Sequence, residues 1–236
     1  MAEEIKMEFD FTPDPKVLIA LTHTPMKPLD ALCELIDNSI DSFNAAKIQS
    51  TGEVDNPIII ISLPKKKDLD NGTGVLRIQD NGPGMTAQNA ENAIKAGFSG
   101  NNPYDSLGLY GMGFNISTGK LGNQTTLMTA RADETTYIKT VINLGRINQT
   151  KNYHLPVEII TKSENRPFST GGHGTIIEVT DWWPKGNDNF GFVQKLGKYG
   201  GNKIREELGR RYATILREGK IKILVDGEKC IPFEHC

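Results

Sequence analysis

A glycine-rich stretch between Gly108 and Gly113 has the spacing that most directly suggests chemistry. It reads Gly-Leu-Tyr-Gly-Met-Gly, and a run without glycine begins at Phe114. Glycines at this spacing let the backbone bend with positive φ and approach a ligand without intervening Cβ atoms. A helix that starts at Phe114 presents free N–H groups to an anion, since its first turn has no internal acceptors. The stretch predicts a phosphate cradle; a glycine turn that merely enters a helix is the structural alternative.

A second group of polar side chains lies on a predicted helix over residues 28–48. Glu34, Asn38 and Asp41 recur at i, i+4 and i+7, so they share one face. The apolar stripe of the same helix is made by Leu32, Leu35, Ile36, Ile40 and Phe43. The polar face offers carboxylate and amide groups and no cation until Lys47, whereas a solvated face normally mixes both signs. An ordinary surface helix is the alternative.

A carboxylate at the end of a predicted strand is the third feature. Residues 75–79 read as the second strand of a hairpin, and Asp80 follows them directly. Gly82 and Gly84 make the next turn, which leads to Thr86, a residue suited to cap a helix. The sequence therefore places one acid and two glycines at a single turn.

The elements that must position these residues predict an α+β fold. Strands are expected over residues 57–63, 75–79, 125–131, 135–144, 157–161, 174–180, 221–225 and 229–231. Helices are expected over 14–21, 28–48, 86–97, 114 onwards and 190–218, the last with a break at 198–202. Residues 64–74 read as a turn-rich connection, and residues 97–108 read as a mobile loop.

Composition narrows the class of protein. With 236 residues, 37% hydrophobic and 24% charged, the chain fits one soluble domain spanning residues 1–236. The net charge of −2 argues against a broad basic face for nucleic acid. Three cysteines without CxxC spacing, an acidic N-terminus and no long apolar run predict a cytoplasmic protein without a membrane segment. The abrupt end at residues 233–236 suggests a piece of a longer protein.

Four motifs, in chain order, resemble the ATP-binding motifs of the GHKL superfamily, which includes gyrase B, the ninety-kilodalton heat-shock chaperones, histidine kinases and MutL. They are Glu34-Leu-Ile-Asp37-Asn38, Asp80-Asn-Gly82-Pro-Gly84, Gly108-Leu-Tyr-Gly111-Met-Gly113 and Gly174-Thr175. ELIDNSIDS, with GFSG and LGLYGMGF, is most similar to the MORC-like ATPases and their bacterial relatives. The resemblance implies a Bergerat-type two-layer α/β sandwich: helices on one face of a mixed, mostly antiparallel sheet, with ATP between the helices and a flexible lid.

The resemblance implies roles that agree with the chemistry of the side chains. Asp80 would accept a hydrogen bond from the exocyclic amine of adenine, whereas the carbonyl of guanine at that position would face a negative oxygen. Gly82 and Gly84 would let the chain pass close to the base. Asn38 would ligate Mg²⁺, which takes few protein ligands in phosphate sites. Glu34 would hold and deprotonate the attacking water.

Further contacts carry over with the motifs. The remaining expected nucleotide contacts are Asp37, Met85, Gly108, Tyr110, Gly111, Met112, Gly113, Phe114 and Thr175. Thr175 would support Asp80 and a base-side water, or be an ordinary strand threonine. Asp37 and Asp41 either border the site or are helix-surface acids. Lys120 either reaches a phosphate or faces solvent, and Lys95, Ser99 and Asn102 are candidate phosphate contacts. Trp182 and Trp183 are expected in the core or at an interface.

The expected function is Mg²⁺-dependent ATP binding and slow hydrolysis that drives lid closure and nucleotide-dependent homodimerisation. Related hydrolases receive a γ-phosphate-sensing lysine from a second domain, so we expect the isolated piece to bind ATP or ADP with little turnover. Histidine-kinase-type phosphotransfer is one alternative, but no helical hairpin with a phosphoacceptor histidine precedes the motifs, and His23 lies too near the N-terminus. A non-hydrolysing, nucleotide-dependent interaction module is the other. Nucleic acid is a possible partner through regions outside this chain.

Overall fold

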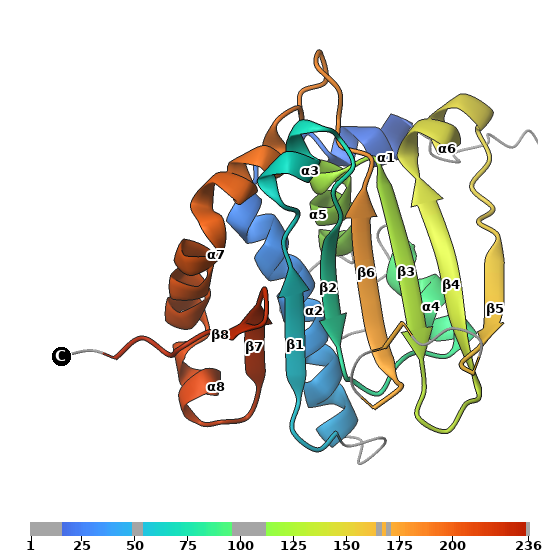
Figure 1. The fold of residues 1–236 in the computed structure, drawn as a ribbon. Helices are drawn as coiled ribbons and strands as arrows, with labels where there is room; N and C mark the ends of the chain where they lie inside the picture. The colour runs from blue at the N-terminus through green and yellow to red at the C-terminus, as the bar shows by residue number, and fades with distance from the viewer. Residues whose placement is uncertain (1–15, 49–53, 96–111, 164–166, 169–170, 235–236) are drawn as a thin grey trace, which may run out of the picture.

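An eight-stranded sheet forms the centre of the protein (Figure 1). The computed structural model describes residues 16–48, 54–95, 112–163, 167–168 and 171–234. The strand order is β5-β4-β3-β6-β2-β1-β7-β8, and within it the β1–β7 pair is parallel while the other pairs are antiparallel. The strands are β1 Ile58–Ser62, β2 Leu76–Asp80, β3 Gln124–Ala130, β4 Thr136–Asn143, β5 Val157–Thr161, β6 Gly174–Thr180, β7 Lys222–Val225 and β8 Glu228–Lys229.

Helices cover one face of this sheet. Figure 1 shows α2, α4 and α5 together behind the strands, with α7 beside α2 next to the β7 edge. The helices are α1 Lys16–Leu21, α2 Pro28–Ile48, α3 Lys66–Asp70, α4 Ala87–Ile94, α5 Gly113–Leu121, α6 Leu144–Thr150, α7 Phe192–Arg211 and α8 Ala213–Arg217. The predicted α+β class, with a mixed, mostly antiparallel sheet and helices on one face, is confirmed. None of the described helices combines the length and apolarity that a membrane span requires.

The main core lies between α2 and the central strands. Leu32, Leu35 and Ile36 of α2 are fully buried, as the apolar stripe of the sequence predicts. Successive residues of a strand face opposite sides of the sheet, so Leu76, Ile78 and Asp80 of β2 all face the helices. Asp80 is therefore the last residue of a core-facing row, and the sheet itself carries the carboxylate under the helix layer.

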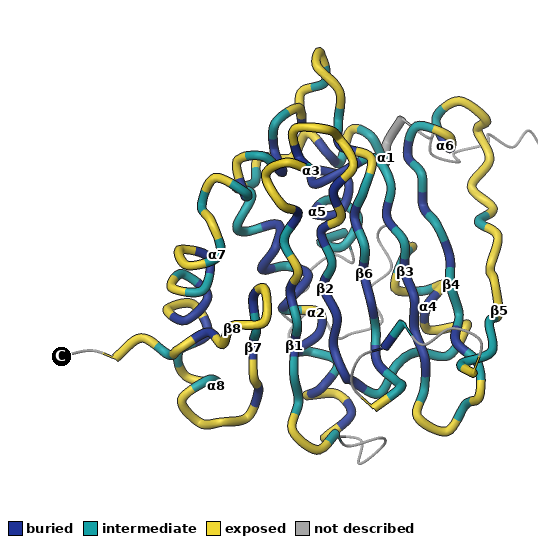
Figure 2. Tube along the Cα trace, viewed as in Figure 1, coloured by how far each residue is buried: buried dark blue, intermediate teal, exposed yellow. Residues whose placement is uncertain are grey.

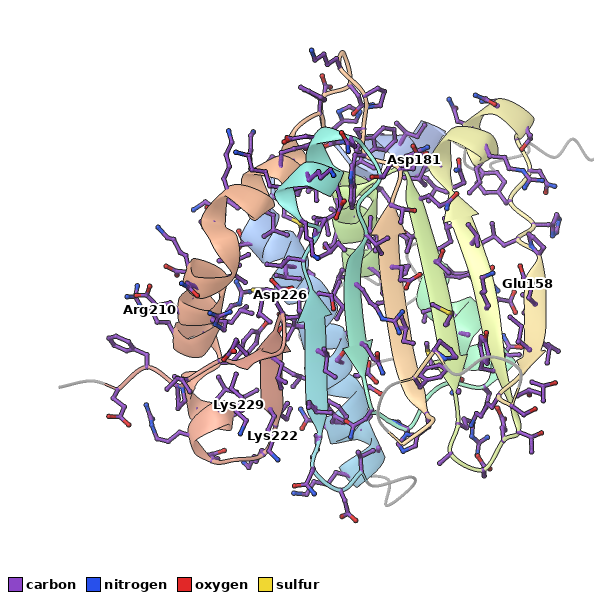
Figure 3. All side chains as sticks on the ribbon, viewed as in Figure 1. Glu158, Asp181, Arg210, Lys222, Asp226 and Lys229 are labelled. Carbon is purple, nitrogen blue, oxygen red and sulfur yellow. The ribbon has the colours of Figure 1, made fainter. Side chains whose placement is uncertain are left out.

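The outer face of the sheet carries a second, smaller core. Phe168, from the connection between β5 and β6, packs edge-on against Tyr137 with ring centroids 5.9 Å apart. The edge strand β5 is far more open: Ile159 is 73% exposed, and Glu158 pairs with Lys139 of β4 (Figures 2 and 3). The interior of the molecule thus lies at β1, β2, β3 and β6, where the candidate residues are.

Two short helices differ from the sequence predictions. The connection 64–74 contains α3, because Leu69 of this polar segment is buried against Gly197 of α7. The strand predicted to run to residue 144 ends at Asn143, whose side-chain oxygen accepts a hydrogen bond from the backbone N–H of Arg146 at 2.8 Å and caps α6. Both helices depend on contacts or caps that an apolar pattern does not reveal.

The long C-terminal helix is broken where the sequence predicts. Gly200 has φ 71° and ψ 156°, a conformation outside the helical region that glycine tolerates. The helix begins at Phe192 and ends at Arg211, so it is shorter at both ends than the predicted range 190–218; α8 takes up the rest. The end of α7 therefore lies at Arg211 and Tyr212, next to α2.

Candidate functional site

Asp80 is the most completely enclosed acid among the predicted site residues. Its Oδ1 accepts hydrogen bonds from the backbone N–H groups of Gly82 at 2.8 Å and Thr175 at 3.1 Å. Its Oδ2 accepts one from the hydroxyl of Ser39 at 3.0 Å. A carboxylate has about four acceptor positions. Oδ1 is therefore filled by the protein, while Oδ2 keeps one position that these three donors do not use.

The environment of Asp80 also sets its charge. Burial raises the pKa of this carboxyl from its usual range to about 6, against the hydrogen bonds from Gly82, Ser39 and Thr175 and the nearby His173, which lower the pKa. Without those donors the carboxylate would be harder still to ionise. The side chain is thus ionised at neutral pH and held in one orientation.

The glycines of the following turn are required by the protein's own packing. A Cβ at Gly82 would lie 2.8 Å from Oδ1 of Asp80. Gly84 has φ +70°, and a Cβ there would lie 1.9 Å from the carbonyl oxygen of Ala130 in β3. Met85 continues the turn, and its N–H donates to the hydroxyl of Thr129 at 2.9 Å. The expectation that Gly82 and Gly84 let the chain pass close to a base remains a prediction.

The Gly174-Thr175 pair supports Asp80 through the backbone. The N–H of Thr175 makes the contact, whereas the hydroxyl of Thr175 lies 3.4 Å from that of Thr129. Gly174 has φ +117°, and a Cβ there would lie 2.1 Å from the carbonyl oxygen of Asp80. The start of β6 is therefore pressed directly against the end of β2.

His173 belongs to the same cluster, and the sequence alone does not single it out. Its Nδ1 lies 2.7 Å from the carbonyl oxygen of Gly82. The one signal that points to it is its position immediately before Gly174-Thr175. Residues 80 and 82 thus meet residues 173, 174 and 175 across the β2–β6 junction, and Ser39 contacts Asp80 from α2.

The polar face of α2 is present as predicted. Glu34 and Asp41 are half-buried, and Asn38 is exposed, with no hydrogen bond to another residue in the described ranges. Burial, and then the charge of Asp37, raise the pKa of both Glu34 and Asp41. This face therefore combines a free amide with carboxyl groups that accept protons more readily than usual.

Glu34 lies next to the beginning of α5. A Cβ at Gly113 would lie 2.5 Å from Oε2 of Glu34, so glycine at this position leaves room for the carboxylate. Helix α5 starts at Gly113, one residue before the predicted Phe114, and Met112 caps it without a side-chain hydrogen bond. The first-turn N–H groups of α5 thus have no side-chain cap from Met112, and Phe114 packs half-buried against the core. Such a helix start favours an anion.

Asp37 is engaged by the end of α7. The hydroxyl of Tyr212 donates to Oδ1 of Asp37 at 2.7 Å and lies 3.3 Å from the carbonyl oxygen of Cys33. The guanidinium of Arg211 contacts Asp30 at 3.2 Å and approaches Oδ2 of Asp37 at 3.9 Å. Asp37 therefore has a structural role in fastening α7 to α2. No sequence pattern points to Tyr212.

Lys120 occupies neither of its two predicted environments. Lys120 does not face solvent, since it is only 6% exposed. Its Nζ donates hydrogen bonds to the carbonyl oxygen of Thr22 at 2.7 Å and to Oδ1 of Asn189 at 3.3 Å. The ammonium also lies over the ring of Phe192, 5.2 Å from its centroid. Burial lowers the pKa of this amine. Lys120 therefore ties α5 to the end of α1 and the start of α7, which corrects the phosphate and solvent alternatives.

Several predicted residues fall beyond what the structure describes. Gly108, Tyr110, Gly111, Ser99 and Asn102 all belong to residues 96–111, outside the described residues. Lys95 precedes them and pairs with Glu91 of α4 at 2.9 Å. Trp182 is buried and the indole N–H of Trp183 donates to Gly119 O at 2.6 Å, so both tryptophans are packing residues as expected.

Among the residues that the structure describes, side chains alone do not form a metal site. The described residues contain no group of three or more His, Cys, Asp or Glu side chains arranged to hold an ion. In phosphate sites Mg²⁺ keeps most of its waters and is bound through one or two protein oxygens together with phosphates. Asn38 is an exposed residue on the polar face of α2, and its amide oxygen is a donor of the kind that fits such an ion.

The arrangement as a whole has two chemically different ends joined by α2. At one end, near Ser39, a buried carboxylate offers a free acceptor. Earlier on α2, Glu34 lies beside Gly113 at the N-terminus of α5. A ligand with a hydrogen-bond donor at one end and anionic groups at the other fits this arrangement.

Comparison with known proteins points to the same kind of ligand. Residues 26–175, well over half of the chain, match the model of a family described as "Histidine kinase-, DNA gyrase B-, and HSP90-like ATPase". The match begins just before α2 and ends at Thr175, so it contains the predicted site residues and both ends of the arrangement.

Individual relatives are similar over shorter stretches. Protein MICRORCHIDIA 6 of Arabidopsis thaliana is 27% identical over 52% of this chain and 17% of its own length. MORC family CW-type zinc finger protein 3 of Mus musculus is 29% identical over 64% of this chain and 15% of its own length. Protein MICRORCHIDIA 1 of Arabidopsis thaliana is 30% identical over 39% of this chain and 13% of its own length. The chain thus matches less than a fifth of the length of each relative.

Proposed function

This chain belongs to the histidine kinase-, DNA gyrase B- and HSP90-like ATPase family and is MORC-like within it, and we propose that it binds Mg²⁺-ATP across α2. In this proposal the adenine lies at Asp80, and the phosphates lie near Glu34 and the start of α5. The nucleotide is hydrolysed slowly to ADP and phosphate. The unused acceptor position on Oδ2 of Asp80 is the observation that carries the proposal.

Asp80 recognises adenine by hydrogen-bond polarity. The backbone donors on Oδ1 and the hydroxyl of Ser39 fix the carboxylate, so Oδ2 presents an acceptor toward the exocyclic amine. A base with a carbonyl in the same place would set two acceptors against each other in a buried position, which costs roughly 1–3 kcal/mol or more. This polarity makes the site selective for adenine over guanine.

Glu34 is the general base. Its pKa is raised, first by burial and then by Asp37, which moves the carboxyl toward the pH at which proton transfer is efficient. The carboxylate lies beside Gly113 at the start of α5, where the γ-phosphate would be held. Glu34 orients a water for attack and takes its proton.

Asn38 would hold the magnesium ion. It lies one turn after Glu34 on the same face of α2, and its amide oxygen is exposed. When bound, Mg²⁺ neutralises charge that develops on the phosphate oxygens. Asn38 would be the ligand that the described residues offer to the ion.

Closure over the nucleotide of the lid that the sequence predicts, the loop at residues 97–108 with the glycines that follow it, and dimerisation in response to it are the proposed consequences of binding. The glycines at 108, 111 and 113 support a segment that rearranges around phosphates. The relatives are longer proteins than this chain. We therefore propose that the process driven by ATP, and any nucleic-acid partner, involve parts of the protein outside this chain.

Substitution of the base tests the hydrolytic part of the proposal. Glu34→Gln keeps the shape of the side chain and removes its basicity, so ATP hydrolysis by a longer form of the protein should fall roughly 10²–10⁴-fold. ATP affinity measured by calorimetry should change little. Unchanged phosphate release would remove Glu34 from the role of base, and transfer of the γ-phosphate to protein in place of phosphate release would favour a kinase.

A further inference from the structure

We propose that His173 is a positioning residue for base recognition: its imidazole holds the carbonyl of Gly82, and the N–H of the same glycine holds Asp80. The inference rests on the proposed nucleotide-binding function and deepens it. His173 does not touch the base; it acts through the turn that carries the recognising carboxylate.

Gly82 is held from both sides. Its N–H donates to Oδ1 of Asp80 at 2.8 Å, and its carbonyl oxygen lies 2.7 Å from Nδ1 of His173. A carbonyl oxygen can only accept a hydrogen bond, so Nδ1 of His173 must carry the proton. The imidazole is thereby assigned to the Nδ1–H form, and the Gly82 residue bridges the histidine to the carboxylate.

The surrounding backbone is shaped to admit this ring. Gly171 has φ +68°, and a Cβ there would lie 2.8 Å from Nε2 of His173. On the other side of the histidine, a Cβ at Gly174 would lie 2.1 Å from the carbonyl oxygen of Asp80. Glycine at both positions lets residues 171–175 wrap closely around the turn after β2. The contact is therefore built by several residues and is not an incidental surface hydrogen bond.

The backbone of the turn after β2 has little conformational restraint of its own, because it contains Gly82 and Gly84. Gly82 has no Cβ to limit its dihedral angles, and Gly84 adopts a left-handed conformation two residues later. Glycine loses more conformational freedom than other residues when it is fixed. The Gly82 carbonyl belongs to the Gly82–Pro83 peptide and the Gly82 N–H to the Asn81–Gly82 peptide, so hydrogen bonds to both limit the two dihedral angles of Gly82 between them. The bond from His173 thereby helps to keep the Oδ1 donor in place. Losing it allows the carboxylate to rotate away from the orientation that the base requires.

Loss of the His173 hydrogen bond is expected to affect binding of the base and binding of the phosphates differently. A ligand that contains only the phosphate part contacts the start of α5 and the polar face of α2, so it does not depend on the turn at residues 80–82. Loss of the His173 hydrogen bond should therefore weaken adenine nucleotides and leave inorganic tripolyphosphate unaffected. A general loss of folding would weaken both.

The test compares variants of nearly equal shape. His173→Leu removes the donor, while His173→Asn places an amide N–H₂ where Nδ1 stood. His154→Ala is the control, because His154 is an exposed histidine between α6 and β5. Calorimetry measures the Kd of Mg²⁺-ADP and of Mg²⁺-tripolyphosphate for each variant, and thermal unfolding checks that each one is folded.

His173→Leu should weaken ADP binding roughly 5- to 10-fold, the worth of one neutral hydrogen bond. Tripolyphosphate binding should be unchanged, His173→Asn should recover most of the ADP affinity, and His154→Ala should match the native protein. Equal ADP affinity in the native protein and His173→Leu would overturn the proposal, as would an equal loss for ADP and tripolyphosphate. Failure of the native protein to bind ADP would instead overturn the proposed function.

A measurement on the native protein does not depend on any variant's folding. Nitrogen-15 NMR of the histidine rings, at a pH where imidazole is neutral, distinguishes the two tautomers. The signal of His173 should show a protonated Nδ1 and a bare Nε2, the less common form. A protonated Nε2 with a bare Nδ1 would contradict the hydrogen bond to Gly82.

Discussion

Burial of the Asp80 carboxyl costs the folded protein stability. Burial raises its pKa to about 6, above the value of about 4 that an exposed aspartate has. Between these two values the folded state holds a proton that the unfolded state has released. This group therefore favours folding most at low pH, and that contribution is lost as the pH rises through 6. A carboxylate kept charged in such a place is consistent with a role in binding.

Nucleotide binding should be linked to a proton on Asp80. The amine of adenine favours the ionised carboxylate, so binding near pH 6 should release roughly half a proton per nucleotide from this group, and little at pH 8. Calorimetry of ADP binding in buffers of different ionisation enthalpy measures this release. ADP affinity should also decline as the pH falls through about 6. Proton release that is absent at every pH between 5 and 7 would remove Asp80 from contact with the base.

At the scale of elements, the end of α7 fastens the helix that carries the site. Tyr212 and Arg211 contact Asp37 and Asp30 on α2, on either side of Glu34. Arg210, the neighbouring arginine, points away and pairs with Glu206 and Glu207 of its own helix (Figure 3). The position of the proposed base is therefore set partly by a segment more than 170 residues further along the chain.

Tyr212→Phe should destabilise the protein by roughly 1–3 kcal/mol, because it removes a hydrogen bond to a charged group. Urea unfolding followed by circular dichroism measures the change. Tyr199→Phe is the matched control, since Tyr199 is a half-buried tyrosine of α7 whose hydroxyl makes no hydrogen bond to a described residue. Equal stability of Tyr212→Phe and the native protein would mean that the Asp37 contact contributes nothing to folding.

The elements also show which features a sequence can predict. The apolar stripe of α2, the Thr86 cap and the break at Gly200 are local, and the structure confirms them. Asp80 was predictable because it follows the period-two pattern of β2 directly. Lys120 and Tyr212 could not be placed, since the partners that determine their positions lie 98 and 175 residues away.

On the scale of the whole molecule, the sheet brings the distant parts of the site together. The β2–β6 pairing places residues 173–175 against the turn after Asp80, although nearly a hundred residues separate them. Helix α2 then carries the site from Ser39 to Glu34, toward the start of α5. The order of the four motifs is visible in the sequence, whereas the role of His173 exists only once β6 pairs with β2.

The substitution Asp80→Asn, which replaces one carboxylate oxygen by an amide nitrogen, is the most direct test of base recognition. Because Oδ1 is occupied by two backbone N–H donors, Asp80→Asn should place its oxygen there and its N–H₂ group where Oδ2 was. By calorimetry, ADP affinity should fall by roughly 1.5–3 kcal/mol, and inosine diphosphate, which has a carbonyl in place of the amine, should bind the variant better than ADP. Equal ADP affinity in the native protein and Asp80→Asn would contradict the account.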